Sequence, residues 1–202
     1  VRSSVTVLAQ VSVTNQDEVL MVLPGDFSNN GITIRREGEF IRVLRTGTNL
    51  DELTPRRISQ ISGIVVEGRA TLDDELVVDF SAGNPIIGSL SYEGGSGGDD
   101  SLTLLGTTFD TVTHTFVDGS SGSVSMTASG SPTTSLSYTG LEPINDQLGA
   151  TTRRFEFGGG DDDVTFSAGS VGNDGISRVS SVASSETVDF VNPTGSLTID
   201  LG

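Results

Sequence analysis

Short hydrophobic segments alternate with polar turns along this chain, which is the pattern of an all-β protein. Near the start, Val5, Val7, Val11 and Val13 are spaced so that they fall on one face of an extended strand. Continuous apolar segments follow at residues 19–23, 32–34 and 40–44. From residue 64 onward, strand centres recur at a fairly even spacing, near Val65, Val77, Leu90, Thr103, Thr113, Ser125, Ser137, Phe155, Thr165, Val179, Val188 and Thr198. Gly and Asp clusters separate nearly all of them, so the sequence predicts many short strands and disfavours long helices.

Such strands are compatible with a β-sandwich or with a β-solenoid, in which two or three strands make each coil. Internal similarity favours the solenoid, because residues 73–83, 98–106 and 160–169 share two acids, one variable residue, alternating apolar residues and a closing Gly. The closing segment 195–202 keeps the strand half of this pattern. A turn that recurs before equivalent strands is what stacked coils produce, so we expect these copies to lie in register above one another. The acids recur at unequal intervals, since Asp162 follows Asp100 at a much greater distance than Asp100 follows Asp74, so the coils would differ in length. We therefore predict a right-handed parallel β-helix with irregular coils, and keep the β-sandwich as the alternative.

Charge divides the chain into two parts. The net charge is −16 and every basic residue is Arg. Residues 1–69 hold eight Arg and eight acids, whereas residues 70–202 hold three Arg and nineteen acids. Such a surface repels nucleic acid and attracts cations. We expect one continuous solenoid segment over residues 1–202, with less regular coils at 1–62 and Asp/Gly-rich coils at 63–202.

The ends and the composition suggest a module cut from a larger protein. The chain begins at Val1, contains no Cys, and has no apolar run long enough to span a membrane. We therefore expect no disulfides and no direct membrane insertion. Open β-helix ends would expose unpaired backbone, which predicts end-to-end association with neighbouring modules or like copies.

Two Gly/Asp turns come close to the calcium-binding repeat G-G-x-G-x-D-x-U-x, at residues 94–102 and 158–164. Glycines allow tight turns whose carbonyl groups point inward, and carboxylates add the hard oxygen ligands that Ca²⁺ prefers. The candidate ligands are Asp99, Asp100, Asp161, Asp162 and Asp163. The alternative is that each Gly-Asp-Asp segment is a solvated turn that leads into a strand.

Nothing in the sequence forms a distinct catalytic motif. The acidic pairs lie in repeated turns, whereas an active site is normally a unique constellation. The only histidine, His114, lies on an alternating strand, and a lone strand His is more often a surface or packed residue than a catalytic base. With no Trp and only Tyr92 and Tyr138, the chain offers few aromatic platforms for sugars. We predict that the protein is not an enzyme.

Several segments resemble modules of giant bacterial surface proteins, of the adhesin-like and hemolysin-type calcium-binding-repeat kinds. The segments are 91–104, 108–113, 137–144 and 186–190, and the most specific string is Tyr-Thr-Gly-Leu-Glu-Pro-Ile at 138–144. The resemblance implies a repetitive parallel solenoid, extracellular or on the cell surface, with a structural or adhesive function. A calcium-dependent module that binds cell-surface glycans is the alternative, and a polysaccharide-cleaving β-helix enzyme is a weaker one.

Overall fold

The computed structural model describes residues 18–26, 31–158, 163–169, 174–181 and 185–202, and these residues are almost entirely β-structure. Its strands are β1 (Glu18–Val22), β2 (Gly31–Glu37), β3 (Phe40–Arg45), β4 (Arg56–Arg57), β5 (Ile61–Glu67), β6 (Glu75–Asp79), β7 (Ser89–Glu93), β8 (Ser101–Leu105), β9 (Thr108–Phe116), β10 (Ser121–Thr127), β11 (Thr134–Thr139), β12 (Ile144–Asp146), β13 (Gly149–Glu156), β14 (Val164–Ala168), β15 (Ile176–Ser181), β16 (Ser185–Val191) and β17 (Ser196–Asp200). Two 3₁₀ turns, η1 (Pro24–Asp26) and η2 (Ile58–Gln60), are the only helical elements in this part of the chain. None of the described helices is long and apolar enough to cross a membrane.

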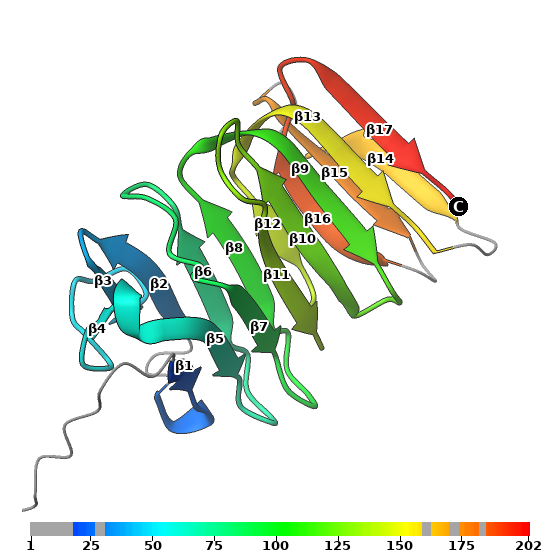
Figure 1. Ribbon diagram of the computed structural model, residues 1–202. Helices are drawn as coiled ribbons and strands as arrows, with labels where there is room; N and C mark the ends of the chain where they lie inside the picture. Colours follow the sequence, from blue (N-terminus) through cyan, green and yellow to red (C-terminus); the bar gives the residue numbers. More distant parts are fainter. Residues whose placement is uncertain (1–17, 27–30, 159–162, 170–173, 182–184) are drawn as a thin grey trace, which may run out of the picture.

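The strands form two mixed sheets and no closed barrel. Sheet A has the order β1-β5-β7-β11-β10-β9-β13-β17, and sheet B has the order β14-β15-β16-β12-β8-β6-β2-β3-β4. The chain passes repeatedly from one sheet to the other, so that β5, β7, β11 and β13 of sheet A alternate with β6, β8, β12 and β14 of sheet B. Strands β1–β4 lie at one end of the molecule and β17 lies at the other (Figure 1). Three groups of consecutive strands, β2–β4, β9–β11 and β14–β16, run through their sheet in the direction opposite to this overall advance of the chain.

Several parallel pairs have the same offset in the two sheets, although the offsets differ in the middle of the molecule, where Leu90 is opposite Leu136 and Leu102 is opposite Ile144. Ile64 of β5 is opposite Leu90 of β7, and Leu76 of β6 is opposite Leu102 of β8. Both pairs are 26 residues apart in the sequence, as are Asp74 and Asp100. A longer offset, again shared by the two sheets, occurs at the beginning of the described chain, where Leu20 is opposite Ile64 and Ile32 is opposite Leu76. The same longer offset returns near the end, where Ile144 is opposite Val188 and Arg153 is opposite Leu197. The longer offsets occur where the chain adds antiparallel strands, β3 and β4 in the first case and β14 and β15 in the second.

The predicted strands are largely confirmed. Every strand centre expected from residue 64 onward falls inside a strand, and the apolar segments at 19–23, 32–34 and 40–44 correspond to β1, β2 and β3. The strand expected over residues 5–13 lies outside the described residues. Sequence patterning missed β4 and β12, which have only two and three residues. A segment that short contains too few positions for an alternating pattern to show.

The repeated acidic turns are equivalent in one case only. Residues 73–83 and 98–106 contain β6 and β8, which are parallel neighbours in sheet B. The third copy, at 160–169, contains β14, which pairs antiparallel with β15 at the edge of the same sheet. The closing segment 195–202 contains β17, which belongs to sheet A. The prediction that all these copies stack on one another was therefore wrong, because the same local pattern also suits an edge strand.

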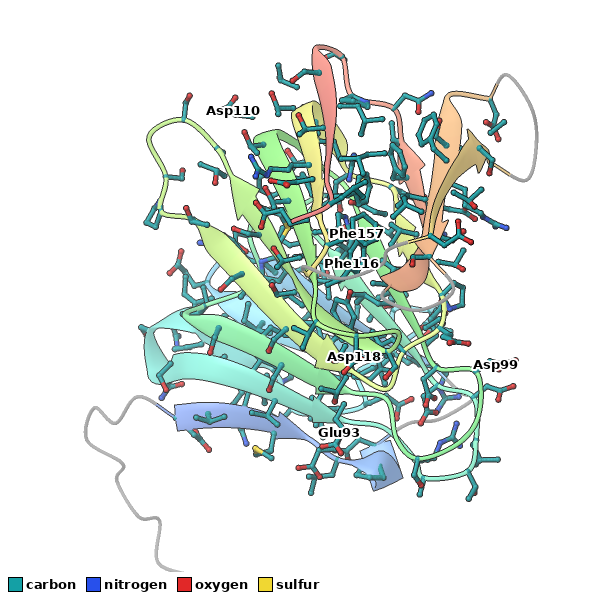
Figure 2. The ribbon with its side chains drawn as sticks, turned by 90° about the vertical axis from the view of Figure 1, so that its right-hand side faces the viewer. Glu93, Asp99, Asp110, Phe116, Asp118 and Phe157 are labelled. Carbon is teal, nitrogen blue, oxygen red and sulfur yellow. The ribbon has the colours of Figure 1, made fainter. Side chains whose placement is uncertain are left out.

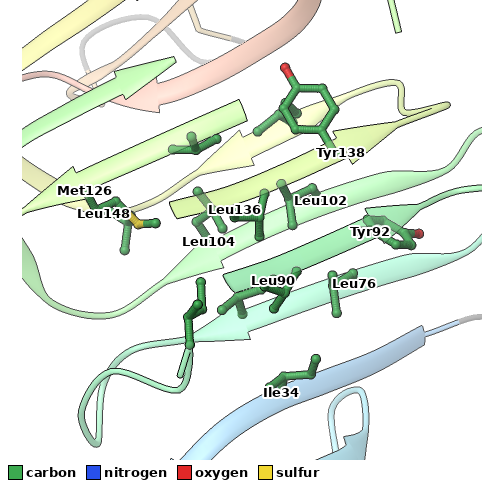
Figure 3. Packing of buried hydrophobic residues seen from close by; sticks show 14 of the residues in the cluster. Ile34, Leu76, Leu90, Tyr92, Leu102, Leu104, Met126, Leu136, Tyr138 and Leu148 are labelled. Atoms are coloured by element: carbon green, nitrogen blue, oxygen red, sulfur yellow. The ribbon is translucent and has the colours of Figure 1, made fainter. Parts of the chain in front are cut away.

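One hydrophobic core joins the two sheets. Side chains at alternate positions of the strands are buried, and residues of both sheets contribute to a single cluster. Figure 3 shows part of it, in which Leu90 and Leu136 of sheet A lie with Leu76 and Leu102 of sheet B. Burying one such aliphatic side chain stabilises the folded state by about 1.5–3 kcal/mol. Six Phe of the described part of the chain are buried in the core, whereas Phe166 is half exposed; the buried ones are Phe80, Phe109, Phe116, Phe155, Phe157 and Phe190.

Candidate functional site

The turns that lead from sheet A to sheet B form one edge of the molecule, and two of the predicted calcium residues, Asp99 and Asp100, belong to this edge. Residues 68–74 connect β5 to β6, and residues 94–100 connect β7 to β8. Backbone hydrogen bonds join each of these turns to the next. Gly68 N donates to Glu93 O at 2.7 Å, Gly94 N donates to Thr139 O at 2.9 Å, and Glu142 N donates to Asp100 O at 2.7 Å. The turns therefore stack as the strands do.

Close stacking explains why glycine stands at equivalent places in these turns. A Cβ atom on Gly68 would lie 2.1 Å from the carbonyl oxygen of Gly94, and one on Gly94 would lie 2.3 Å from that of Gly140. Both separations are far below van der Waals contact with backbone atoms that cannot rotate away. The glycines of the Gly-Gly-x-Gly segment thus have a packing function that does not depend on a bound metal.

The carboxylates of the stacked turns accept hydrogen bonds from the neighbouring turn. Asp100 Oδ1 accepts from Asp74 N at 2.8 Å, and Asp73 Oδ1 accepts from Asp99 N at 2.9 Å. Arg69 Nε donates to Asp74 Oδ1 at 2.8 Å. Asp74 and Asp100 are buried, whereas Asp99 is exposed at the rim in Figure 2. Asp73 and Asp100 thus bind the backbone of the neighbouring turn, whereas Asp74 binds Arg69 of its own turn.

Burial also shifts the pKa values of two groups at this edge, Asp100 and Tyr92. The pKa of Asp100 is raised, mainly by burial and further by the negative charges of Asp74 and Asp73, while the amide of Asp74 opposes the shift. Burial likewise raises the pKa of the Tyr92 hydroxyl, which donates to the carbonyl oxygen of Asp74 at 3.3 Å. The edge therefore contains buried carboxylates that repel one another and are held in place by amides and by Arg69.

The predicted calcium residues do not meet at one place among the described residues. Asp163 is exposed and precedes β14, and in sheet B the strands β12, β16 and β15 stand between β8 and β14. Asp161 and Asp162 lie outside the described residues. Within the described part of the chain, no three or more His, Cys, Asp or Glu side chains are grouped as metal ligands. Calcium binding at these turns stays a prediction. The residues that do lie beside Asp99 and Asp100 are Asp73 and Asp74, which the repeat spacing could have identified.

A second group of charged residues is completely buried between the sheets. His114 Nε2 lies 2.8 Å from Asp146 Oδ2, and Arg153 pairs with the same oxygen through Nη1. Arg153 Nη2 donates to Leu148 O at 2.7 Å, and Leu148 N donates to Asp146 Oδ1 at 3.0 Å. His114 and Arg153 belong to sheet A and Asp146 belongs to sheet B, so this His114–Asp146–Arg153 triad connects the two layers.

The triad has a defined protonation state. Burial lowers the pKa of His114, although its hydrogen bond with Asp146 acts in the opposite direction. Burial alone would raise the pKa of Asp146, but the hydrogen bond with His114 and the charge of Arg153 outweigh it, and the net pKa is lowered. Asp146 is thus ionised and His114 neutral. Because a carboxylate only accepts, Nε2 of His114 carries the hydrogen. Nδ1 is buried without a hydrogen-bond partner.

Aromatic rings enclose the triad. The ring of His114 stacks on that of Phe155 with centroids 5.1 Å apart, and the Arg153 guanidinium lies 5.4 Å from the centroid of Phe190. Phe116 and Phe157 lie beside them, between the layers (Figure 2), with their ring centroids 4.9 Å apart. The only histidine of the chain is therefore a packed residue with no access to a substrate. Its two charged partners were not predicted, since both lie on later strands, far from His114 in the sequence.

A pocket lies at the opposite edge, where sheet B leads into sheet A. It has a volume of about 620 Å³ and is bounded by the segments 80–88, 107–109 and 128–134. Its floor is apolar, with Phe80 and Phe109 in edge-to-face contact. Asn84 Nδ2 donates to Thr134 Oγ1 at 2.7 Å and links two of the segments. The pocket holds no acid, base or histidine among its lining residues.

No protein-family model matches this chain, and neither the curated proteins nor the solved structures include a significant match.

Proposed function

We propose that the chain is a β-solenoid module, a right-handed parallel β-helix with coils of unequal length, and that it has a structural or adhesive function in a larger bacterial surface protein. The observation that carries the proposal is the equal offset of parallel pairing in the two sheets, which is the same for β5–β7 as for β6–β8. A coil that advances both sheets by the same number of residues is the repeating unit of a solenoid. In a sandwich of two independently formed sheets, nothing requires the two sheets to have the same pairing offset.

The chemistry of the described residues supports a non-catalytic function. The only histidine is enclosed by Phe155 and neighbouring rings, and the buried acids of the turn edge accept hydrogen bonds from backbone amides. What the molecule presents to solvent is mainly Ser, Thr, Asp and Gly on a chain of net charge −16. Such a surface is suited to a hydrated, extended spacer or to contact with polar ligands such as glycans. Secretion or display at the cell surface belongs to the same proposal.

A duplication experiment tests the solenoid. Residues 75–100 span one complete coil, and a second copy inserted after residue 100 adds one strand to each sheet. In a solenoid the inserted coil stacks on its neighbours, so we expect a cooperative unfolding transition at a temperature equal to or above that of the parent. The matched control inserts only residues 75–87, half a coil. It moves every later strand into the wrong sheet and should abolish cooperative unfolding. Equal damage by both insertions would contradict the proposal.

A binding experiment separates adhesive from purely structural function. The fluorescently labelled chain is applied to an array of neutral and acidic glycans, once with calcium and once with chelator. Binding in both buffers supports an adhesive module, and binding only with calcium supports the calcium-dependent alternative. Release of cleaved products from any glycan would overturn the assignment as non-catalytic.

A further inference from the structure

None of the described residues covers the inner face of the two sheets at the end formed by β17 and β14. Leu197 and Ile199 of β17 stand opposite Arg153 and Phe155, both fully buried, so their side chains face the core. They are nevertheless 37% and 36% exposed. Phe166 of β14 stands opposite the buried Val179 and is 51% exposed. Side chains that face the core are therefore exposed to solvent at the last strand of each sheet, as expected where no further strand packs over them.

The opposite end offers a hollow between the edges of the two sheets. A pocket of about 330 Å³ lies between β1 and residues 53–56, which lead into β4. Leu20 and Leu53 line it, and both pack against the core. Among the described residues, no strand pairs with the outer edge of β1 or of β4. This end can accept apolar side chains, and the other end presents them.

The polarity of the strands allows the two ends to join by simple translation. In sheet A, the two antiparallel steps at β10 cancel, so β1 and β17 run in the same direction. In sheet B, the paired antiparallel steps at each end also cancel, so β4 and β14 run in the same direction. A second molecule placed head to tail would thus extend both sheets with parallel pairs. The five-residue strands β17 and β1 provide the longer of the two new edges.

Charge favours the same orientation over its alternative. Residues 158–202 contain seven acids and a single Arg, whereas residues 18–69 contain seven acids and seven Arg. The edge strand β4 consists of Arg56 and Arg57, both exposed. Asp163 is exposed beside β14, and a second molecule placed head to tail extends sheet B from β14 to β4, so this acid comes near Arg56 and Arg57. The preference for the head-to-tail orientation should decrease as salt screens the charges.

We infer that this chain binds a second copy of itself head to tail, with β17 of one molecule added in parallel to β1 of the next. The inference rests on the proposed solenoid and deepens it, because it specifies which ends meet and in which polarity. Such a contact uses two different surfaces and does not close on itself, so each addition leaves both kinds of end free. The expected product at high concentration is a series of linear oligomers.

Cross-linking tests the polarity directly, since the chain has no native Cys. Thr198→Cys marks the outer face of β17, and Met21→Cys marks the outer face of β1, where Met21 is exposed. An equimolar mixture of the two variants, treated with a short bis-maleimide, should give the heterodimer. Each variant alone should stay monomeric under the same treatment. Dimers of T198C alone, or of M21C alone, would show a symmetric contact and overturn the head-to-tail inference.

A matched pair of charge variants tests the surface itself. Ile199→Glu places a carboxylate on the uncovered inner face, and Thr198→Glu places the same charge on the outer face of the same strand. In sedimentation velocity we expect I199E to weaken association at least about tenfold, because it removes one buried aliphatic side chain from the joint. T198E should change association much less. Thermal melts establish that both variants are folded.

A wild-type chain that stays monomeric at the highest accessible concentration would overturn the inference. The duplicated-coil experiment does not depend on association. If the duplicated-coil protein unfolds cooperatively and the wild-type chain is strictly monomeric, the solenoid proposal is supported. Only the inference that a second copy binds at the β17 end is then overturned.

Discussion

The two halves of the stack bury different chemistry between the same two sheets. From β1 to β8 the core is mainly Ile, Leu and Val, and the pairing offset is shortest here, between β5 and β7 and between β6 and β8. From β9 to β17 the core contains a group of aromatic rings and the buried triad, and its final strands leave core-facing side chains exposed. Antiparallel strands added to a sheet do not by themselves account for the difference, because β3 and β4 lengthen the offset in the first half while its core stays mainly aliphatic. In the second half, aromatic and charged side chains fill the space between the sheets and connect them.

Breaking the triad should give the largest effect and would establish how far the second half depends on it. Asp146→Asn removes the negative charge and leaves the Arg153 guanidinium buried without its carboxylate partner. We expect a loss of about 3–5 kcal/mol in the free energy of unfolding, measured by urea denaturation. The control is Asp189→Asn, which removes a partly exposed pair with Arg178 and should cost about 1 kcal/mol or less. Equal losses would mean that the triad is not buried in solution.

Truncating one leucine in each half compares a covered core with an uncovered one. Leu90 of β7 is fully buried among aliphatic neighbours, and Leu90→Ala should cost about 2–5 kcal/mol. Leu197 of β17 faces the same interlayer space but is more than one-third exposed, so Leu197→Ala should cost clearly less in dilute monomer. The two values come from urea denaturation under identical conditions. A loss at Leu197 as large as at Leu90 would indicate that something covers this end.

Acid should weaken the second half through His114. Its pKa is lowered by burial in the folded state, so below the unfolded value of about 6.5 the unfolded chain binds the extra proton. The stabilising contribution is complete above about pH 6.5 and is lost as the pH falls, by at most about 1.4 kcal/mol per pH unit for one proton. Asp146, whose pKa is also lowered, adds a loss only at more acidic pH.

The measurement is the free energy of unfolding between pH 7 and pH 5, for the wild type and for His114→Gln. The chain has a single His, so the variant should lose the steep part of this dependence. The raised pKa of Asp100 acts in the opposite direction and is present in both proteins, so it cancels in the comparison. Parallel profiles for the two proteins would rule out His114 as the source.

The smallest effect is expected at the acidic turns. Because the buried carboxylates of Asp74 and Asp100 already bind Arg69 and a backbone amide, any increase in melting temperature from chelator to millimolar calcium should be small. A ligand that binds only the folded state raises this temperature by mass action. An increase with calcium and not with magnesium would establish a specific site and would make the turn edge the functional part of the molecule.

Sequence patterning was most successful where burial alternates over several residues. It located the strands from β5 to β17 except the short β12, and it identified the repeat that relates Asp74 to Asp100. It could not distinguish an equivalent strand stacked in parallel from an edge strand paired antiparallel, which is how β14 came to be misassigned. It also missed the triad, because no local pattern relates His114 to Asp146 and Arg153.

The sequence by itself determined the all-β class, the positions of most strands and the acidity of the second half. These follow from hydrophobic alternation, from Gly and Asp at turns and from composition, all of which are local properties. Only the tertiary structure decided which strands are neighbours, which acids close a turn and which charges are buried together. Those choices depend on contacts between residues far apart in the chain, such as the fully buried pairing of Asp146 in sheet B with His114 and Arg153 in sheet A.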